Sequence, residues 1–167
     1  MHADLSIIEK QVYSPCKFRL SHFTEEIESK EYSAAAFVLN ELRIKLRVAK
    51  TTPAKVGQFV TLWKRNKAGI TKPYDISDEV DIVVICTRKN NQLGQFVFPK
   101  SILVDQGIFS ISGKGGKRGF RVYPPWDLAP NKQAHKTQQW QLNFFLEILD
   151  LSVLNLDRAK ILYSKAS

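Results

Sequence analysis

An almost continuous apolar run, VDIVVICT at residues 80–87, constrains the fold of this chain more than any other feature. Only Asp81 and Thr87 interrupt the run, and turn residues bound it on both sides. Short apolar runs rich in β-branched residues are typical of a central strand in a sheet. The sequence therefore predicts a β-sheet around residues 80–87, and other segments have to supply the neighbouring strands.

Alternation of apolar and polar residues begins at Tyr32 and predicts several of these strands. They are expected at residues 33–39, 43–50, 58–64 and 95–99, with a tight turn at Asn40-Glu41 between the first two. A final hairpin is predicted from residues 108–111 and 118–123, joined by the loop 112–117.

Helical periodicity appears at both ends of the chain and between strands. Helices are expected at residues 4–12, 21–30, 100–105, 136–150 and 155–163, the last one capped by Asn155. Because helices flank a mostly sequential meander, the predicted class is α+β, with a central, mostly antiparallel mixed sheet. A length of 167 residues suits one domain, so residues 1–167 are expected to form a single domain.

Composition argues against several classes of protein. No window approaches the roughly 18 apolar residues of a membrane span, and the start MHADLSIIEK is unlike a signal peptide. Cys16 and Cys86 match no metal-binding spacing, and two free thiols suit a reducing compartment. We therefore expect a cytoplasmic protein with no membrane partner and no metal site.

Positive charge is segregated along the chain. Residues 43–72 contain nine Lys or Arg and no acid, which equals the formal net charge of +9 of the whole protein. A second acid-free stretch, residues 106–126, adds Lys114, Lys117, Arg118 and Arg121. Segregated charge produces a focused positive field and favours a phosphate-bearing partner. A solvated basic face without a ligand is the alternative interpretation.

The alternation in residues 43–50 places Arg43, Lys45 and Arg47 on one face of the predicted strand. On an exposed face their spacing of about 6.6 Å would suit the phosphates of an extended single strand, although edge strands also carry lysine to prevent aggregation. Lys50 continues the opposite, apolar row. It either reaches solvent at the end of the strand or points into a functional cleft.

Two further segments are candidates for contacts with nucleic acid. Trp63 stands beside Lys64 and Arg65, which makes it a base-stacking candidate, with a place in the core as the alternative. The loop 112–119, SGKGGKRG, combines glycines, whose backbone N–H groups can approach an oxyanion, with three cations. A flexible hairpin tip is the alternative for this loop.

An acidic cluster precedes the central strand, at Asp75, Asp78, Glu79 and Asp81. Nucleases need two or more carboxylates to hold Mg²⁺, usually with a lysine near the attacking water. Asp81 together with Lys50 or Lys100 would meet part of that need, while ordinary turn and cap residues are the competing explanation. The histidines form no catalytic triad pattern and no zinc site with other residues.

Several segments resemble the MepB-like protein family, over roughly residues 33–148. They are RVAKTTPAKVGQFVTLWKR (47–65), PYDISDEVDIVV (73–84), GQFVFPKSIL (94–103), GKGGKRGFRVYPPWD (113–127) and KTQQWQ (136–141). The resemblance implies a restriction-endonuclease-like fold of the PD-(D/E)XK type. In such nucleases an acid and a lysine two residues later share one strand face. The matching triplet here is Val48-Ala49-Lys50, so the lysine is present and the acid is lost.

The leading hypothesis is a nucleic-acid-binding protein on a nuclease-like scaffold with a degenerate active site, which contacts DNA or RNA mainly through phosphates. An active nuclease that requires Mg²⁺, with a displaced carboxylate from Glu25, Glu26, Glu28 or Asp81, is the second hypothesis. A module that binds a nucleotide or an acidic protein is the third. No cofactor is expected unless the protein is a nuclease, and the sequence leaves the oligomeric state open. The expected nucleic-acid contacts are Arg43, Lys45, Arg47, Lys50, Lys55, Trp63, Lys64, Arg65, Lys100, Lys114, Lys117, Arg118 and Arg121.

Overall fold

The computed structural model describes residues 1–148 and 156–164. Its helical elements are α1 (Ala3–Ile8), η1 (Glu9–Tyr13), η2 (Lys30–Tyr32), α2 (Lys100–Asp105), α3 (Lys132–Leu142) and α4 (Leu156–Leu162). Its strands are β1 (Leu20–Glu25), β2 (Ala35–Leu39), β3 (Leu42–Val48), β4 (Lys50–Thr52), β5 (Lys55–Thr61), β6 (Trp63–Arg65), β7 (Thr71–Pro73), β8 (Ile82–Lys89), β9 (Gln92–Pro99), β10 (Gly119–Val122) and β11 (Phe145–Glu147).

The main sheet has six strands in the order β1-β2-β3-β8-β9-β11. β3 and β8 pair in parallel, from Ile44 opposite Ile82 to Val48 opposite Cys86, and the other neighbours pair antiparallel. The predicted central strand is confirmed, because β8 lies between β3 and β9. The predicted α+β class with a mostly antiparallel mixed sheet is confirmed as well.

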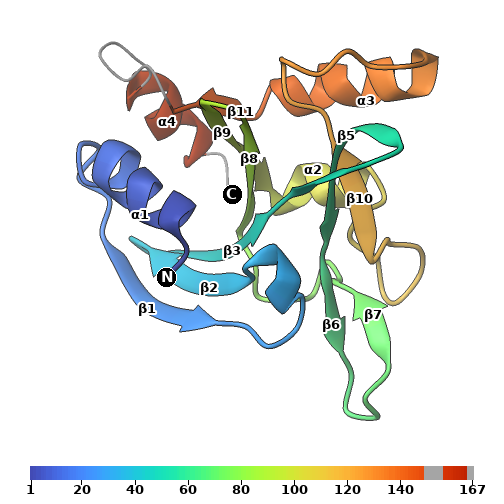
Figure 1. The fold of residues 1–167 in the computed structure, drawn as a ribbon. Helices are drawn as coiled ribbons and strands as arrows, with labels where there is room; N and C mark the ends of the chain where they lie inside the picture. The colour runs from blue at the N-terminus through green and yellow to red at the C-terminus, as the bar shows by residue number, and fades with distance from the viewer. Residues whose placement is uncertain (149–155, 165–167) are drawn as a thin grey trace.

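Both faces of the main sheet are covered, which explains why β8 is apolar on both sides. Ile82, Val84 and Cys86 belong to a first core beneath α1, η1 and α4, while Val83 and Ile85 belong to a second core on the opposite face. Figure 1 shows α1 and α4 on one side of β8 and β9, and β5 and β10 on the other. Successive side chains of β8 therefore pack alternately into the first and the second core.

A second, three-stranded sheet in the order β10-β5-β4 covers the second core. Val60 of β5 and Phe120 and Val122 of β10 are buried in this core. β6 and β7 form a separate two-stranded ribbon beside this sheet (Figure 1). In the part of the chain that the structure describes, no helix is long and apolar enough to cross a membrane.

Residues 21–30 form no long helix, contrary to the prediction. Most of this segment is β1, which pairs antiparallel with β2 from Leu20 opposite Leu39 to Glu25 opposite Ala35. A bulge between Ser21 and Thr24 breaks the alternation that would have indicated a strand. Pairing with β2 and packing of Leu20 and Phe23 on the first core outweigh the local helical preference.

The C-terminal part also differs from the prediction. The helix expected at 136–150 begins and ends earlier, as α3, because Phe145–Glu147 pair with β9 as β11. Residues 149 and 150 lie outside the described residues, and so does the proposed cap Asn155, while α4 confirms the last helix. Residues 119–122 form a strand as expected, but it pairs with β5 rather than with 108–111.

Candidate nucleic-acid interface

The three cations of β3 do not share one exposed face: Arg43 is exposed, Lys45 is half-buried and Arg47 is buried. The register of β3 with β8 places Lys45 opposite Val83 and Arg47 opposite Ile85, the residues of β8 that face the second core. The side chain of Arg47 is consequently 0% exposed. Its Nη1 donates to the carbonyl of Leu46 at 2.9 Å.

Glu26, which directly follows β1, supplies the counter-charge for this face. One carboxylate oxygen accepts a hydrogen bond from Nη2 of Arg47 at 3.0 Å, and the other is paired with Nζ of Lys45. Glu26 is itself only 14% exposed. The carboxylate that sequence analysis considered for metal binding therefore holds two cations in place.

Arg43, at the edge of the same face, is paired with Asp81. The carboxylate of Asp81 accepts from the backbone N–H of Arg43 at 2.7 Å and from its Nε at 3.1 Å. Glu79 adds a second ion pair to Arg43 at 3.5 Å. Partial burial opposes ionisation of Asp81, but these hydrogen bonds outweigh it and lower its pKa below the usual value. Asp81 is therefore an ionised partner of Arg43.

Three more of the predicted contact cations have internal partners. Lys64 donates to Asp78 at 2.6 Å, and Arg65 donates to Glu28 at 2.9 Å. Lys100 donates to the carbonyl of Ile76 at 3.0 Å and also to that of Asp78.

Trp63 is half-buried, with the guanidinium of Arg65 5.1 Å from its ring centroid. That guanidinium is also the ion-pair partner of Glu28.

The other six predicted contact cations have no acidic partner within the described residues. Three belong to the second sheet, and three lie in the glycine-rich loop or directly before β10; they are Lys50, Lys55, Arg121, Lys114, Lys117 and Arg118. In Figure 1, β5 and β10 and the loop that enters β10 stand on one side of the molecule, away from α1 and β1. Most of the predicted contact cations without an acidic partner thus lie on this side, and Lys100, which donates to two backbone carbonyls, is the exception among the described residues.

The glycine-rich loop already holds an anion of its own, the carboxylate of Asp75. This carboxylate accepts from the N–H of Gly113 at 3.0 Å and from the hydroxyl of Ser110 at 2.7 Å. The N–H and hydroxyl of Ser77 donate to its second oxygen at 3.0 and 2.7 Å. The bond from Gly113, followed by those from Ser77 and Ser110, lowers the pKa of Asp75 far below the usual value. The loop therefore presents side-chain charge to solvent, while the N–H of Gly113 is already used.

The structure does not bring Lys50 and Asp81 together. Asp81 precedes the β3–β8 ladder at Ile44 and Ile82, and Lys50 follows its far end at Val48 and Cys86. Four residue steps of a strand span about 13 Å, so the two side chains begin at least that far apart. Lys100, by contrast, is a neighbour of Asp81, because its backbone N–H donates to the carbonyl of Asp81 at 3.0 Å.

No group of three or more His, Cys, Asp or Glu side chains is arranged to hold a metal ion within residues 1–148 and 156–164. The triplet Val48-Ala49-Lys50 spans the break between β3 and β4, and Val48 packs against the first core. The position of the missing acid is therefore an apolar core position.

A row of two aromatic rings between two cations crosses the second sheet, and sequence analysis missed the two rings at its centre. Lys50 and Arg121 are the direct strand partners of Phe59 on its two sides. Nζ of Lys50 lies 5.0 Å from the ring centroid of Tyr32, which is 6.3 Å from that of Phe59. The guanidinium of Arg121 lies 5.8 Å from the Phe59 ring centroid. The sequence offered one indication. In a strand, Phe59 and Thr61 face the side opposite to the buried Val60, so Phe59 could have been predicted to lie away from the core.

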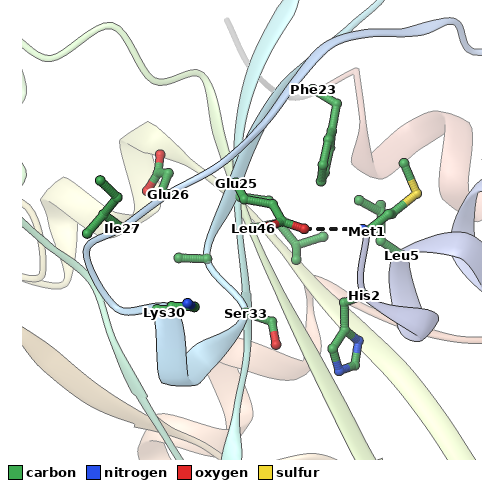
Figure 2. Close-up of a pocket in the computed structure, with 12 residues that line it drawn as sticks. Met1, His2, Leu5, Phe23, Glu25, Glu26, Ile27, Lys30, Ser33 and Leu46 are labelled. Atoms are coloured by element: carbon green, nitrogen blue, oxygen red, sulfur yellow. Dashed lines mark hydrogen bonds and ion pairs between the residues drawn. The ribbon is translucent and has the colours of Figure 1, made fainter.

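A cavity of about 450 Å³ lies between the start of α1 and the strands β1 and β2. Figure 2 shows Glu25 pointing across it toward Met1, whose amino group is 3.2 Å from the carboxylate, while Glu26 points away from it. None of the predicted contact cations lines this cavity.

These features define an α+β protein whose mixed sheet carries a second sheet with unneutralised cations. The MepB-like family model matches residues 26–147, so the chain belongs to the MepB-like family. The crystal structure of MepB is similar to this chain, with a TM-score of 0.76 at 33% identity over 88% of this chain and 97% of that one. No curated protein sequence matches this chain. The family resemblance is confirmed, whereas the likeness to PD-(D/E)XK nucleases stays a prediction.

We expect Glu26→Gln to destabilise the fold by about 3 kcal/mol, because it leaves the buried guanidinium of Arg47 without a counter-charge. Urea unfolding measures the loss. Glu28→Gln is the matched control and should cost less than about 1 kcal/mol, because its partner Arg65 is largely exposed. Equal losses in the two variants would contradict the role assigned to Glu26. Adding Arg47→Met to Glu26→Gln should restore much of the stability.

We expect the stability of the glycine-rich loop to depend on the ionised form of Asp75. Because its folded-state pKa is depressed, its contribution is complete above the unfolded pKa of about 4 and is lost as the pH falls below that value. The melting temperature of Asp75→Asn should therefore be lower than that of the wild type at neutral pH, with the difference shrinking below about pH 4. Glu41→Gln, an exposed turn substitution, should show no such pH-dependent difference.

Proposed function

We propose that this protein binds nucleic acid, mainly through backbone phosphates, on the second sheet and the adjoining glycine-rich loop. One observation carries the proposal: of the seven predicted contact cations that have no acidic partner within the described residues, six lie on this sheet, in this loop or directly before β10, and the seventh, Lys100, donates to two backbone carbonyls. The cations of β3 and β6 are instead balanced by internal carboxylates.

The distribution of partners decides which cations attract a polyanion. A cation paired at 2.6–3.1 Å with a carboxylate contributes little field at a distance, because the two charges nearly cancel. Unpaired cations retain their field and release condensed counterions when they bind phosphates. Of the nine cations in residues 43–72, four have no acidic partner within the described residues, namely Lys50, Lys55, Lys67 and Lys72, and the block after Ser112 adds four more.

The second candidate function, an Mg²⁺-dependent nuclease, has weaker support. Lys50 is the only residue of the expected Val48-Ala49-Lys50 triplet with the chemistry of a nuclease site, and Asp81 lies beyond the opposite end of the β3–β8 ladder. Asp81 and Lys100 are neighbours, and Asp81 is already engaged by Arg43. We therefore propose binding on a nuclease-like scaffold whose active site is degenerate.

The third candidate function is binding of a nucleotide or an acidic protein by the glycine-rich loop. It has less support, because backbone N–H groups of the loop that could bind an oxyanion already have partners. The N–H of Gly113 is bound to Asp75, and the N–H groups of Lys114 and Lys117 are bound to the carbonyls of Ile111 and Ile108. The loop offers its lysine side chains more readily than its backbone, which favours an extended polyanion over one small phosphate.

Fluorescence anisotropy of labelled duplex DNA over a salt series tests the proposal. If all six cations of this sheet and loop that lack an acidic partner contact phosphates, log K should fall with log salt at a slope of about −5. The titration is first run in EDTA and then with Mg²⁺, with the oligonucleotide length checked afterwards. Salt-dependent binding with an intact oligonucleotide supports the proposal, and shortening only with Mg²⁺ supports the nuclease. Failure to bind any DNA or RNA at low salt would overturn the proposal.

We expect Lys114→Gln/Lys117→Gln to make the salt slope for duplex shallower by about 2 and to weaken binding at low salt by about tenfold. Arg43→Gln/Arg65→Gln is the matched control, because it removes the same net charge from cations that have internal partners. The control should change the slope by less than about 0.5. Equal effects of the two pairs would show that net charge alone, and not the unpaired surface, drives binding.

A further inference from the structure

We infer that the second sheet selects single-stranded over double-stranded nucleic acid by stacking bases on Tyr32 and Phe59, with Lys50 and Arg121 holding the flanking phosphates. This inference rests on the proposed function and specifies its substrate class. The four residues form a continuous row from cation to aromatic ring to aromatic ring to cation, with neighbouring members 5.0–6.3 Å apart.

Phe59 is not explained by the core. It belongs to neither of the two core clusters, although Val60, its neighbour in β5, is fully buried in the second. Its ring is half-buried beside Tyr32 and Arg121. Partly exposed aromatic rings next to cations are the groups on which bases stack.

The ring of Phe59 packs closely against the backbone of Gly119, where no side chain is present. A Cβ atom at Gly119 would lie 2.6 Å from Cζ of Phe59, so any larger residue there would displace the ring. Gly119 begins β10 and is the partner of Thr61, the residue two positions after Phe59. The close approach of β10 thus supports the ring from the side of the adjacent strand.

The second ring comes from a different part of the chain. Tyr32 ends η2 and is half-buried, packed partly against the second core. Its ring meets that of Phe59 edge-on, at an interplanar angle of 69°. The Tyr32 ring centroid lies 5.0 Å from Nζ of Lys50, which is exposed and has no acidic partner among the described residues.

The chemistry of this row of two cations and two rings favours single-stranded over double-stranded nucleic acid. Stacking on a protein ring needs a base face, which a duplex offers only at its ends, whereas every base of a single strand has a free face. Arg121 and Lys50 stand on the strands that flank β5, about 4.8 Å to either side, so they are placed to meet phosphates beside the stacked bases. Because stacking reads no hydrogen-bond pattern, weak sequence preference is expected.

The test compares fluorescein-labelled dT₁₂ with a 12-base-pair duplex, by anisotropy at one low salt concentration and over a salt series. We expect Phe59→Leu and Tyr32→Leu each to weaken binding of dT₁₂ by about tenfold. The affinity of each variant for the duplex should change by less than about twofold. The salt slope should stay the same, because neither substitution removes a charge. Phe59→Trp should retain the affinity for dT₁₂, because it keeps a stacking ring.

The outcomes separate this inference from the proposed function. Unchanged dT₁₂ binding in both leucine variants, with wild-type binding still dependent on salt, would overturn the stacking inference and leave the proposed function standing. An equal loss for duplex and dT₁₂ would mean that the rings only support the sheet, and would overturn the inference as well. No binding of either probe by the wild type would overturn both. Melting temperatures of the variants verify that each one is folded.

Discussion

The guanidinium of Arg47 has no access to solvent, and the structure depends on the carboxylate that balances its charge. That carboxylate is Glu26, which the antiparallel pairing of β1 with β2 brings to the β3 strand. Without it, an uncompensated buried charge would face the second core, which would destabilise the packing of the second sheet on the main sheet. The residue that directly follows the N-terminal strand β1 therefore contributes to the stability of this packing.

The same kind of ion pairing divides the cations of the chain into those with an acidic partner and those without one. Acids from distant segments, Glu26, Glu28, Asp78 and Asp81, neutralise the cations of β3 and β6. The cations that lie farther out, on β4, β5, β10 and the glycine-rich loop, keep their field. Internal ion pairs thus convert a broad basic sequence into a narrower basic surface, which also holds two partly exposed rings at its centre.

Strong local patterns predicted their elements well. The run that became β8, the alternation of β2 and β3, and the last helix α4 were all predicted, because each segment has one dominant periodicity. Residues 21–30 and 145–147 were predicted as helix and proved to include strands, since their conformation is set by pairing with β2 and β9. The row of Tyr32 and Phe59 escaped prediction because its members meet only through η2, β4, β5 and β10.

The amino-acid sequence was enough to indicate the family, the α+β class, the central strand and the focused positive charge. The family was indicated by the resemblance of whole segments, whereas the other three properties follow from composition and local periodicity, which need no knowledge of contacts. The tertiary structure sets which cations lack an acidic partner, because the neutralising acids lie far away in the sequence, such as Glu26 beside Arg47 and Asp78 beside Lys64. It also decided that Lys50 lies far from Asp81 and close to Tyr32, because the parallel β3–β8 pair separates the first two and the second sheet joins the others.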